Sequence, residues 1–400
     1  MKKIVFILLF FSSVAESFSQ SVLYFNFMTH NEETLQWDNP TFYANNRLKL
    51  ISLATYFQTN GITWNMQSDW KYLSNVISQD PALITATTNS KNILLWMFED
   101  MGVEMDPHGH ETVYIYPDLV HLMDSIGLPE SKLIGGGIYN DFNGINIWTN
   151  LVNGQNGSVF PSKFWEPDYL MGGGTPMHVA DLNYFGFWNP QSTTSYLTHD
   201  TTSGLRHIGI GCDIKIKDTS DIVYILNDLR EVIQNVQDGS YPANGFYVQN
   251  VFFEQADLNS MLFYNNVIEI ADSMNAWVLA GDAQWKTLKQ SYTLWETVYG
   301  AQMFQWNCDE FVGIEENVNK SIKNVYPNPT SDKLKIEFNA ATFQSGSEIE
   351  IYNLVGERVY KEVILKSVSE IDVHDFSNGV YFYYVRNNQS ILSKGKFIKQ

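Results

Sequence analysis

The stretch Gly102-Val-Glu-Met-Asp-Pro-His-Gly-His-Glu111 predicts more of the fold than any other segment of the chain. The apolar run before it, residues 92–101, indicates a helix that ends at Gly102, and the alternation after the glycine indicates a strand that runs into a loop. Side chains two residues apart on a strand point to the same side. His108 and His110 are therefore expected side by side, and neutral imidazole is the commonest protein ligand of transition metals.

The end of an earlier apolar run, residues 22–28, carries a second set of polar side chains. If that run is a strand, His30, Glu32 and Glu33 lie at its C-terminal end, where parallel strands meet at one edge of a sheet. Histidines and carboxylates from two strand ends predict a site for a divalent ion, and zinc is the first candidate. The alternative for the histidine pair is a solvated turn after Pro107.

Strand-like and helix-like runs alternate through most of the chain. Repeated β-then-α order predicts a parallel sheet, and the number of units predicts a barrel, so the expected fold class is α/β. The reactive groups of such barrels sit at the C-terminal ends of the strands, where this reading puts the histidines. The predicted strands are residues 22–28, 62–66, the histidine-bearing strand, 132–139, 209–216, 245–253 and 277–280, and the predicted helices are residues 47–58, 70–78, 92–101, 117–126, 222–236, 259–274 and 285–299.

A chain of 400 residues is too long for one ordinary core, so we expect two folded units. Residues 1–20 combine Lys2 and Lys3 with a short apolar block and a polar end, which is typical of a secretory signal peptide. The apolar block is too short to cross a bilayer. We therefore expect no transmembrane segment and a mature protein that is soluble outside the cytoplasm.

The net charge of −19 is concentrated in the first part of the chain. Residues 320–400 hold 11 Lys+Arg and 9 Asp+Glu, which leaves 14 Lys+Arg against 35 Asp+Glu for residues 1–319. An acidic body repels nucleic acid and anionic membranes. A neutral or cationic substrate fits better, and nucleic acid is not an expected partner.

Cys212 and Cys308 are the only cysteines of the chain. A secreted protein permits a disulfide, but two cysteines can equally remain buried thiols, and the sequence leaves both possibilities open. No Cys-x-x-Cys spacing occurs, which excludes a thiolate zinc site.

The composition changes towards the C-terminus, because all 11 tryptophans lie before residue 307. Residues 313–324 are polar and without periodicity, as in a linker. Short alternating strands follow and predict a small all-β sandwich. The expected organisation is a signal peptide at 1–20, an α/β barrel at 21–312, a linker at 313–324 and a sandwich domain at 325–400.

The last segment carries Val325-Tyr-Pro-Asn-Pro329, Ile349-Glu-Ile-Tyr-Asn353, Ser377-Asn-Gly-Val-Tyr-Phe382 and the basic finish Lys394–Lys399. These spaced motifs closely resemble the type A C-terminal sorting domain of the type IX secretion system of Bacteroidota. The resemblance implies an export signal that engages the secretion machinery, followed by attachment to the outside of the outer membrane or release. The alternative is a carbohydrate-binding sandwich.

The stretch that opens with Gly102 resembles the Gly-x-Glu-Ile-x-x-His motif of NodB-type polysaccharide deacetylases, whose fold is a distorted (β/α)7 barrel. This family keeps an acidic pair at the end of the first strand, at the position of Glu32 and Glu33. The resemblance implies metal ligands Glu33, His108 and His110 and a catalytic base Glu32, although the two glutamates could exchange roles. His30 would assist catalysis by orienting a carboxylate, or would itself bind the ion.

The chain also departs from that family. Thr112 stands where the family's second histidine is expected, Glu166 replaces the arginine of an Arg-Pro loop, and the predicted strand 277–280 ends without a general-acid histidine. Trp165 and His178 are the candidate substrate-binding residues, for an extracellular polysaccharide.

Two other functions remain open from the sequence. One is a glycoside hydrolase that uses the carboxylates of Glu254 and Asp282. The other is a non-catalytic glycan-binding protein on a deacetylase-like barrel.

Overall fold

The computed structural model describes residues 21–31, 35–110, 113–137, 139–140, 145–173, 182–217, 222–309, 322–339, 345–353, 357–387 and 390–400. The chain divides into two compact units, one up to Asp309 and one from Glu310. The predicted signal peptide and most of the predicted linker lie outside the described residues. The end of that linker prediction is wrong, because residues 322–324 already belong to a strand.

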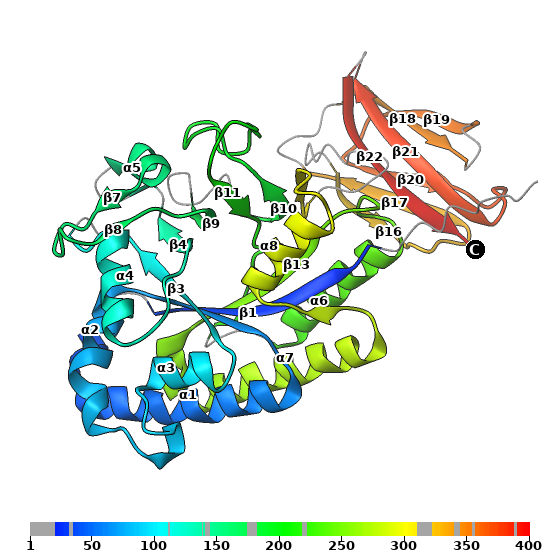
Figure 1. The fold of residues 1–400 in the computed structure, drawn as a ribbon. Helices are drawn as coiled ribbons and strands as arrows, with labels where there is room; N and C mark the ends of the chain where they lie inside the picture. Colours follow the sequence, from blue (N-terminus) through cyan, green and yellow to red (C-terminus); the bar gives the residue numbers. More distant parts are fainter. Residues whose placement is uncertain are drawn as a thin grey trace, which may run out of the picture. The chain divides into compact units, whose positions relative to one another are not determined.

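A long, mostly parallel sheet forms the centre of the first unit (Figure 1). Its strand order is β12-β13-β1-β2-β3-β4-β9-β11-β10-β15; all neighbours are parallel except β11-β10 and β10-β15. Helices alternate with these parallel strands along the chain, so the predicted α/β class is confirmed, and the sheet is curled. Its strands are β1 (Leu23–Asn31), β2 (Trp64–Ser68), β3 (Glu104–Gly109), β4 (Leu133–Gly137), β9 (Tyr169–Gly173), β10 (Tyr184–Trp188), β11 (Arg206–Ile208), β12 (Ile214–Lys215), β13 (Tyr247–Glu254) and β15 (Phe304–Asn307), with β14 (Gln284–Trp285) pairing to β1.

Helices α1, α3 and α7 lie side by side along the outer face of the sheet (Figure 1), whereas α8 packs against Tyr24 and Met28 on its other face. The longest begins at Pro40, where the Asn39 side chain accepts the N–H groups of Thr41 and Phe42, and ends at Gly61 in the left-handed conformation. The helices are α1 (Pro40–Asn60), α2 (Trp70–Gln79), α3 (Ile93–Glu99), α4 (Tyr116–Ser125), α5 (Trp148–Asn153), α6 (Ile222–Gln237), α7 (Met261–Ala280) and α8 (Leu288–Thr297). The short elements are η1 (Leu35–Asp38), η2 (Asp80–Ala82), η3 (Ala86–Thr88), η5 (Gln255–Asn259) and the hairpins β5 (Tyr139–Asn140) with β6 (Ile145–Asn146) and β7 (Gln155–Asn156) with β8 (Phe164–Trp165).

Two predicted strands are wrong. Residues 277–280 are the last turn of α7, because the helical contacts continue past Met274 until Gly281 adopts φ 90° and caps the end. Of the predicted strand 209–216, only Ile214 and Lys215 form a strand, β12, because β11 already ends at Ile208 and Gly211 adopts φ 86° between the two. A short apolar run fits either period, so only the tertiary contacts decide it.

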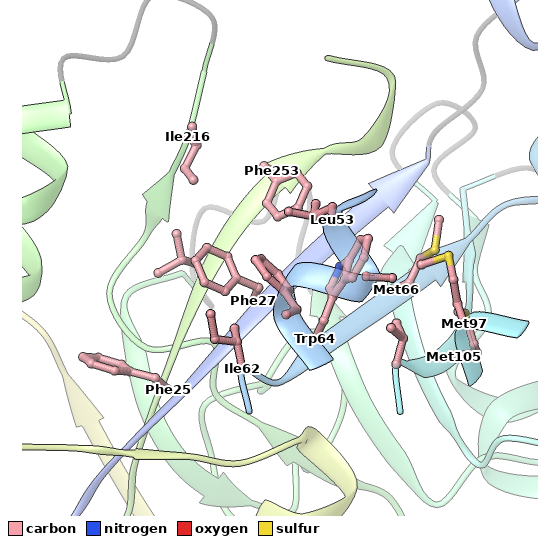
Figure 2. Close-up of a cluster of buried hydrophobic side chains, with 14 of the residues drawn as sticks. Phe25, Phe27, Leu53, Ile62, Trp64, Met66, Met97, Met105, Ile216 and Phe253 are labelled. Atoms are coloured by element: carbon pink, nitrogen blue, oxygen red, sulfur yellow. The ribbon is translucent and has the colours of Figure 1, made fainter. Parts of the chain in front are cut away.

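The outer face of the sheet is apolar. Phe25 and Phe27 of β1, Trp64 and Met66 of β2 and Met105 of β3 form part of a buried core with the helices (Figure 2). The aromatic rings interlock, with the centroids of Phe27 and Phe57 5.0 Å apart. This packing fixes which residues of each strand must face the opposite side.

A disulfide joins Cys212 to Cys308 and settles the question that the sequence left open. Cys212 precedes β12 and Cys308 follows β15, which are the two ends of the strand order. The link therefore ties the two margins of the curled sheet together across 96 residues of sequence.

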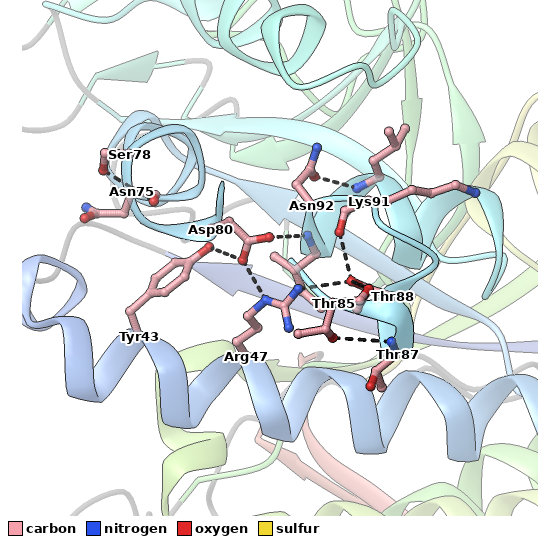
Figure 3. A network of polar contacts seen from close by, with 12 residues as sticks. Tyr43, Arg47, Asn75, Ser78, Asp80, Thr85, Thr87, Thr88, Lys91 and Asn92 are labelled. Atoms are coloured by element: carbon pink, nitrogen blue, oxygen red, sulfur yellow. Dashed lines mark hydrogen bonds and ion pairs between the residues drawn. The ribbon is translucent and has the colours of Figure 1, made fainter. Parts of the chain in front are cut away.

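A buried ion pair anchors α1 to the segment that follows α2 (Figure 3). The Arg47 Nε lies 2.8 Å from Asp80 Oδ1, and the side chains are only 5% and 0% exposed. Tyr43 donates to the same carboxylate, the backbone N–H of Ile93 donates to its second oxygen, and Arg47 also donates to Thr88. Every partner belongs to the scaffold, so this pair has a structural role.

The second unit is all-β, as predicted. Its two sheets, β16-β17-β20 and β19-β18-β21-β22, share one core that includes Ile336, Ile351 and Val385, which makes the unit a sandwich. The strands are β16 (Ile322–Tyr326), β17 (Lys333–Phe338), β18 (Ser347–Tyr352), β19 (Arg358–Ile364), β20 (Val368–Asp372), β21 (Gly379–Asn387) and β22 (Ser390–Lys399).

Candidate functional site

Three of the predicted histidines meet at the C-terminal edge of the parallel sheet. The ring centroids of His30 and His108 are 3.9 Å apart, and those of His108 and His110 are 4.9 Å apart. The Nε2 atoms of His108 and His110 approach to 3.1 Å. His108 is 1% exposed, whereas the other two are half-buried, so the cluster runs from the interior towards solvent.

Gln67 orients His108 from the strand between the two histidine strands. Its Oε1 lies 3.3 Å from the His108 Nδ1. An amide oxygen only accepts, so this contact assigns the imidazole proton to Nδ1 and leaves Nε2 as an acceptor. Gly135 on β4 makes room for this arrangement, because a Cβ at that position would overlap the Gln67 amide. The glycine run 135–137 therefore serves close packing within a strand.

Tyr116 holds the ends of β3 and β4 in place. This first residue of α4 is buried, and its hydroxyl lies 3.1, 2.6 and 3.0 Å from the carbonyl oxygens of Gly109, Gly135 and Gly137. The hydroxyl has one hydrogen, so it donates to one carbonyl at a time. These contacts fix the backbone directly after His108.

Buried amides fix the ends of β1, β2 and β13. Asn31 donates to the Ser68 hydroxyl and to the Gln255 Oε1, both at 2.9 Å. The Asn31 side-chain oxygen accepts the N–H of Asp69, and Gln255 in turn donates to Asn46. Sequence reasoning missed this network, although amides at the ends of apolar strands were a signal for it.

The opposite side of the cluster is formed by β13 and β12. Phe252 lies 4.4 Å from His30 by ring centroids, and the Lys215 Nζ lies 4.2 Å from the Phe252 centroid. Lys215 also forms a 3.0 Å ion pair with Glu254, whose Cα pairs in register with that of His30. Glu254 thus lies at the predicted edge.

Two carboxyl groups lie on the same face of β3 as His108, and of these Asp106 is buried whereas Glu104, at the start of the strand, is half-buried. Asp106 is a buried strand residue that accepts hydrogen bonds from Asn65 and Ser131. Burial raises its pKa to about 6. Burial, and then repulsion from Asp106, raise the pKa of Glu104 to about 8. Glu104 accepts the N–H of Lys289 at the start of α8.

The remaining predicted residues do not join the cluster within the described structure. Glu32, Glu33 and His178 lie outside the described residues. Trp165 is 2% exposed and donates to the Ser131 carbonyl at 2.8 Å, so it has no open face for the predicted sugar contact. Asp282, the second carboxylate of the hydrolase alternative, follows α7 in a turn and accepts from Gln237.

Metal ligands are incomplete among the described residues. Within them, no group of three or more His, Cys, Asp or Glu side chains is placed to hold an ion. Separately, no helix in the described part of the chain is long and apolar enough to span a membrane.

The C-terminal resemblance is confirmed. Residues 324–400 match the model of the secretion system C-terminal sorting domain. The chain therefore ends in a type IX sorting domain, which marks it for secretion and surface attachment. No curated protein matches the chain in sequence.

Three solved structures have limited likeness to the chain. PorZ, a surface component of the type-IX secretion system of Porphyromonas gingivalis, is 19% identical over 20% of this chain and 11% of its own length, with a TM-score of 0.17. A protein from Mycobacterium smegmatis described as a polysaccharide deacetylase is 10% identical over 68% of this chain and 94% of its own, with a TM-score of 0.36. A 4-alpha-glucanotransferase from Thermococcus litoralis is 13% identical over 68% and 40%, with a TM-score of 0.29. At such low TM-scores these likenesses assign neither fold nor activity.

Proposed function

We propose that the first unit is a metal-dependent hydrolase of an extracellular saccharide, and specifically a polysaccharide deacetylase on a distorted (β/α)7 barrel. The single observation that supports it best is the 3.1 Å separation of the His108 and His110 Nε2 atoms. Two nitrogen ligands of one tetrahedral zinc ion are separated by roughly 3.3 Å, given bonds of about 2.0–2.1 Å. The two imidazoles are thus spaced as ligands of one ion.

The orientation of His108 supports the same reading. A histidine ligand generally donates its second ring N–H to a carbonyl or carboxylate, which fixes the tautomer. Gln67 provides such an acceptor for Nδ1, and Tyr116 immobilises the backbone beyond His108. In the proposed site, Glu33 completes the ligand set. The departure of this chain from the family spacing then means that His110 takes over the role expected at Thr112.

The residues of the chain have distinct tasks in the proposed reaction. A bound divalent ion would lower the pKa of a water molecule towards ~7 and polarise the acetyl carbonyl. Glu32 accepts the proton of the attacking water, and His30, packed against His108, orients a carboxylate. The sorting domain supports an extracellular substrate for this proposed activity, because it marks the chain for secretion.

The test is acetate release from a panel of acetylated glycans by the full chain, with and without a chelator. We expect release that the chelator abolishes, and a loss of roughly 10²–10⁴-fold in turnover for Glu32→Gln. Release that ignores the chelator would overturn the metal mechanism. No release from any glycan would favour the non-catalytic glycan-binding protein.

A glycoside hydrolase is the second candidate, because Glu254 lies at the same strand edge beside His30. The position of Asp282 removes the partner carboxylate first considered for it. Cleavage of an unacetylated glycan that depends on Glu254 and ignores a chelator would support this candidate.

A further inference from the structure

The sheet β19-β18-β21-β22 of the second unit (Figure 1) has one face that does not belong to the shared core. Ile349 and Ile351 of β18 are buried in that core, so Glu348, Glu350 and Tyr352 lie on the opposite, outer face. Their partners in register carry mainly basic and aromatic side chains. The residues of this face, called the basic face from here on, are Glu348, Glu350 and Tyr352 of β18, Arg358, Lys361 and Val363 of β19, Phe382, Tyr384 and Arg386 of β21 and Lys396 of β22.

One carboxylate holds three cations at the centre of the basic face. The Arg358 Nη1 and the Lys361 Nζ lie 2.8 and 3.4 Å from Glu350 Oε1. The Arg386 Nε lies 3.3 Å from the second oxygen, Oε2. Glu350 is only 6% exposed although it lies on an outer sheet face, because these cations and the Tyr352 hydroxyl surround it. One negative charge is thus shared by three positive ones.

The two arginines are ordered without being enclosed. The Arg386 guanidinium lies over the Tyr384 ring, 5.5 Å from its centroid, and the Tyr384 and Tyr352 rings meet edge-on with their centroids 5.5 Å apart. The side chains of Arg358 and Arg386 are 50% and 33% exposed. A guanidinium has five N–H donors, so donors remain for a second carboxylate, which arginine binds in a planar fork. Groups that are already positioned lose little conformational entropy when a partner binds.

The outer face of the other sheet, β16-β17-β20, has no such excess of positive charge. Lys333 and Lys335 of β17 both pair with Glu370 of β20, and Asp372 lies in register with Lys333. Among the described side chains that pair in register, this face holds these two cations against three carboxylates, because Glu337 also belongs to it. The basic face holds four cations against two carboxylates. The sandwich therefore presents one positive and one slightly negative face.

The composition of the basic face is typical of a protein interface. Arginine and aromatic residues are enriched in such interfaces. Here arginines lie beside Phe382 and Tyr384, and Val363 is 47% exposed. Anionic lipid surfaces attract clusters of basic residues, whereas Glu348 and Glu350 lie among the cations of this face. Mixed charges next to exposed apolar groups favour a protein partner.

We propose that the basic face is the surface through which the sorting domain binds the secretion machinery, and that the bound component is a protein with acidic side chains at the contact. The family match implies contact with that machinery but assigns no surface of this chain to it. A positive face fits an acidic partner, because complementary charge steers association and fixes orientation. The inference goes beyond the proposed hydrolase and does not depend on it.

The first pair of variants changes one exposed valine on each face of the sandwich. Val363→Glu adds a negative charge to the basic face, and Val368→Glu is the matched control on β20. The two valines are 47% and 48% exposed, and they lie in register with Glu348 and Glu337 respectively. Both variants thus make the same change beside a like charge, and both purified chains should keep the thermal transition of the unmodified chain.

The test measures export of the full chain in a bacterium that has a type IX secretion system, as the ratio of surface and medium protein to periplasmic protein. Val363→Glu should lower this ratio roughly tenfold, and so should Arg358→Gln combined with Arg386→Gln, because a central interface arginine often contributes tenfold or more in affinity. Val368→Glu should be exported as the unmodified chain is.

Equal export of the two valine variants, or normal export of a folded arginine variant, would overturn the basic face as the docking surface. The valine pair decides the question even if the arginine variant fails to fold. Binding of the purified chain to vesicles of anionic phospholipid that is lost in Val363→Glu and kept in Val368→Glu would make the partner a lipid surface, and would overturn the acidic protein.

Discussion

The two ends of β3 carry the same kind of pattern but differ in what surrounds it. Glu104, Asp106, His108 and then His110 follow at alternate positions along one face. At the first end, Glu104 meets the N-terminus of α8, and Tyr292 of that helix stacks on Tyr169 at 4.0 Å.

At the other end, the histidines meet Gln67 and lead to half-exposed side chains. Alternation along the strand puts all four side chains on the inner face. The elements that cover each end of the strand determine whether its side chains have a structural or a chemical role. A helix closes one end and makes its polar groups structural, whereas the open strand edge leaves room for chemistry. Substitutions at the two ends should therefore change different measurements.

The largest loss of stability is expected when the buried ion pair outside the sheet is broken. This pair has a structural role only, so its loss shows how much stability such a group contributes. Asp80→Ala leaves the Arg47 guanidinium buried without its carboxylate. Removing one partner of such a pair costs about 3–5 kcal/mol of unfolding free energy, measured by denaturant titration. Asp38→Ala is the control, because this carboxylate pairs with Lys71 at the surface and its loss should hardly matter. Equal losses of unfolding free energy in both variants would show that the buried pair contributes no more to stability than the surface pair.

The disulfide tests whether the margins of the sheet need to be held together. Replacing Cys212 and Cys308 by serine removes a link across 96 residues. Loss of a native disulfide typically costs about 2–5 kcal/mol, because the unfolded chain gains freedom. Thermal unfolding of the double variant should show a lower midpoint, and so should the unmodified chain under reducing conditions. An unchanged midpoint in both experiments would show that the strand pairing closes the sheet without the link.

The closed end of β3 should make stability depend on pH. The pKa of Glu104 is raised to about 8 by burial, above the ordinary value of 4.5. A carboxyl group with a raised folded-state pKa stabilises the fold fully below its unfolded pKa, and this contribution is lost as the pH rises through the folded value. The stability should therefore fall as the pH rises from about 4.5 to about 8. Glu104→Gln should flatten the profile of melting temperature against pH, and an unchanged slope would argue against a closed, buried end.

Substitutions at the open end of β3 should change catalytic activity rather than stability. Gly135→Ala pushes the Gln67 amide away from His108, while the flexible side chain can move without disturbing the strand. Loss of such an orienting partner costs about 10–100-fold in metal affinity or activity. Gly204→Ala is the matched control, because a Cβ there meets no atom within 4 Å. Wild-type acetate release by Gly135→Ala would show that Gln67 does not orient the histidine.

Local sequence patterns predicted most of the first unit's elements and the position of the histidines. The run before Gly102 became α3, and the strand after it became β3 with His108 and His110 on one side. The spaced motifs of residues 325–400 predicted the sorting domain that the family model confirms. These features depend on residues close together in the chain, so period and turn chemistry are sufficient for them.

Features that depend on distant pairs could not be predicted. The Cys212–Cys308 link and the contact of Asn31 with Gln255 span 96 and 224 residues, and no local pattern specifies either. Trp165 is buried and donates a hydrogen bond to Ser131. The local sequence around a tryptophan does not predict such a contact. The strand predicted for residues 277–280 was wrong because a short apolar run fits a helix and a strand equally well.

Elemental analysis of the purified full chain tests the central claim most directly. The unmodified protein should hold about one equivalent of a divalent ion, because the His108 and His110 nitrogens are spaced as ligands of one ion. The variant with His108→Ala and His110→Ala should fold, as judged by its thermal transition, and hold background metal only. Equal metal content in the two proteins, or none in the unmodified chain after supply of zinc, would contradict the proposed centre.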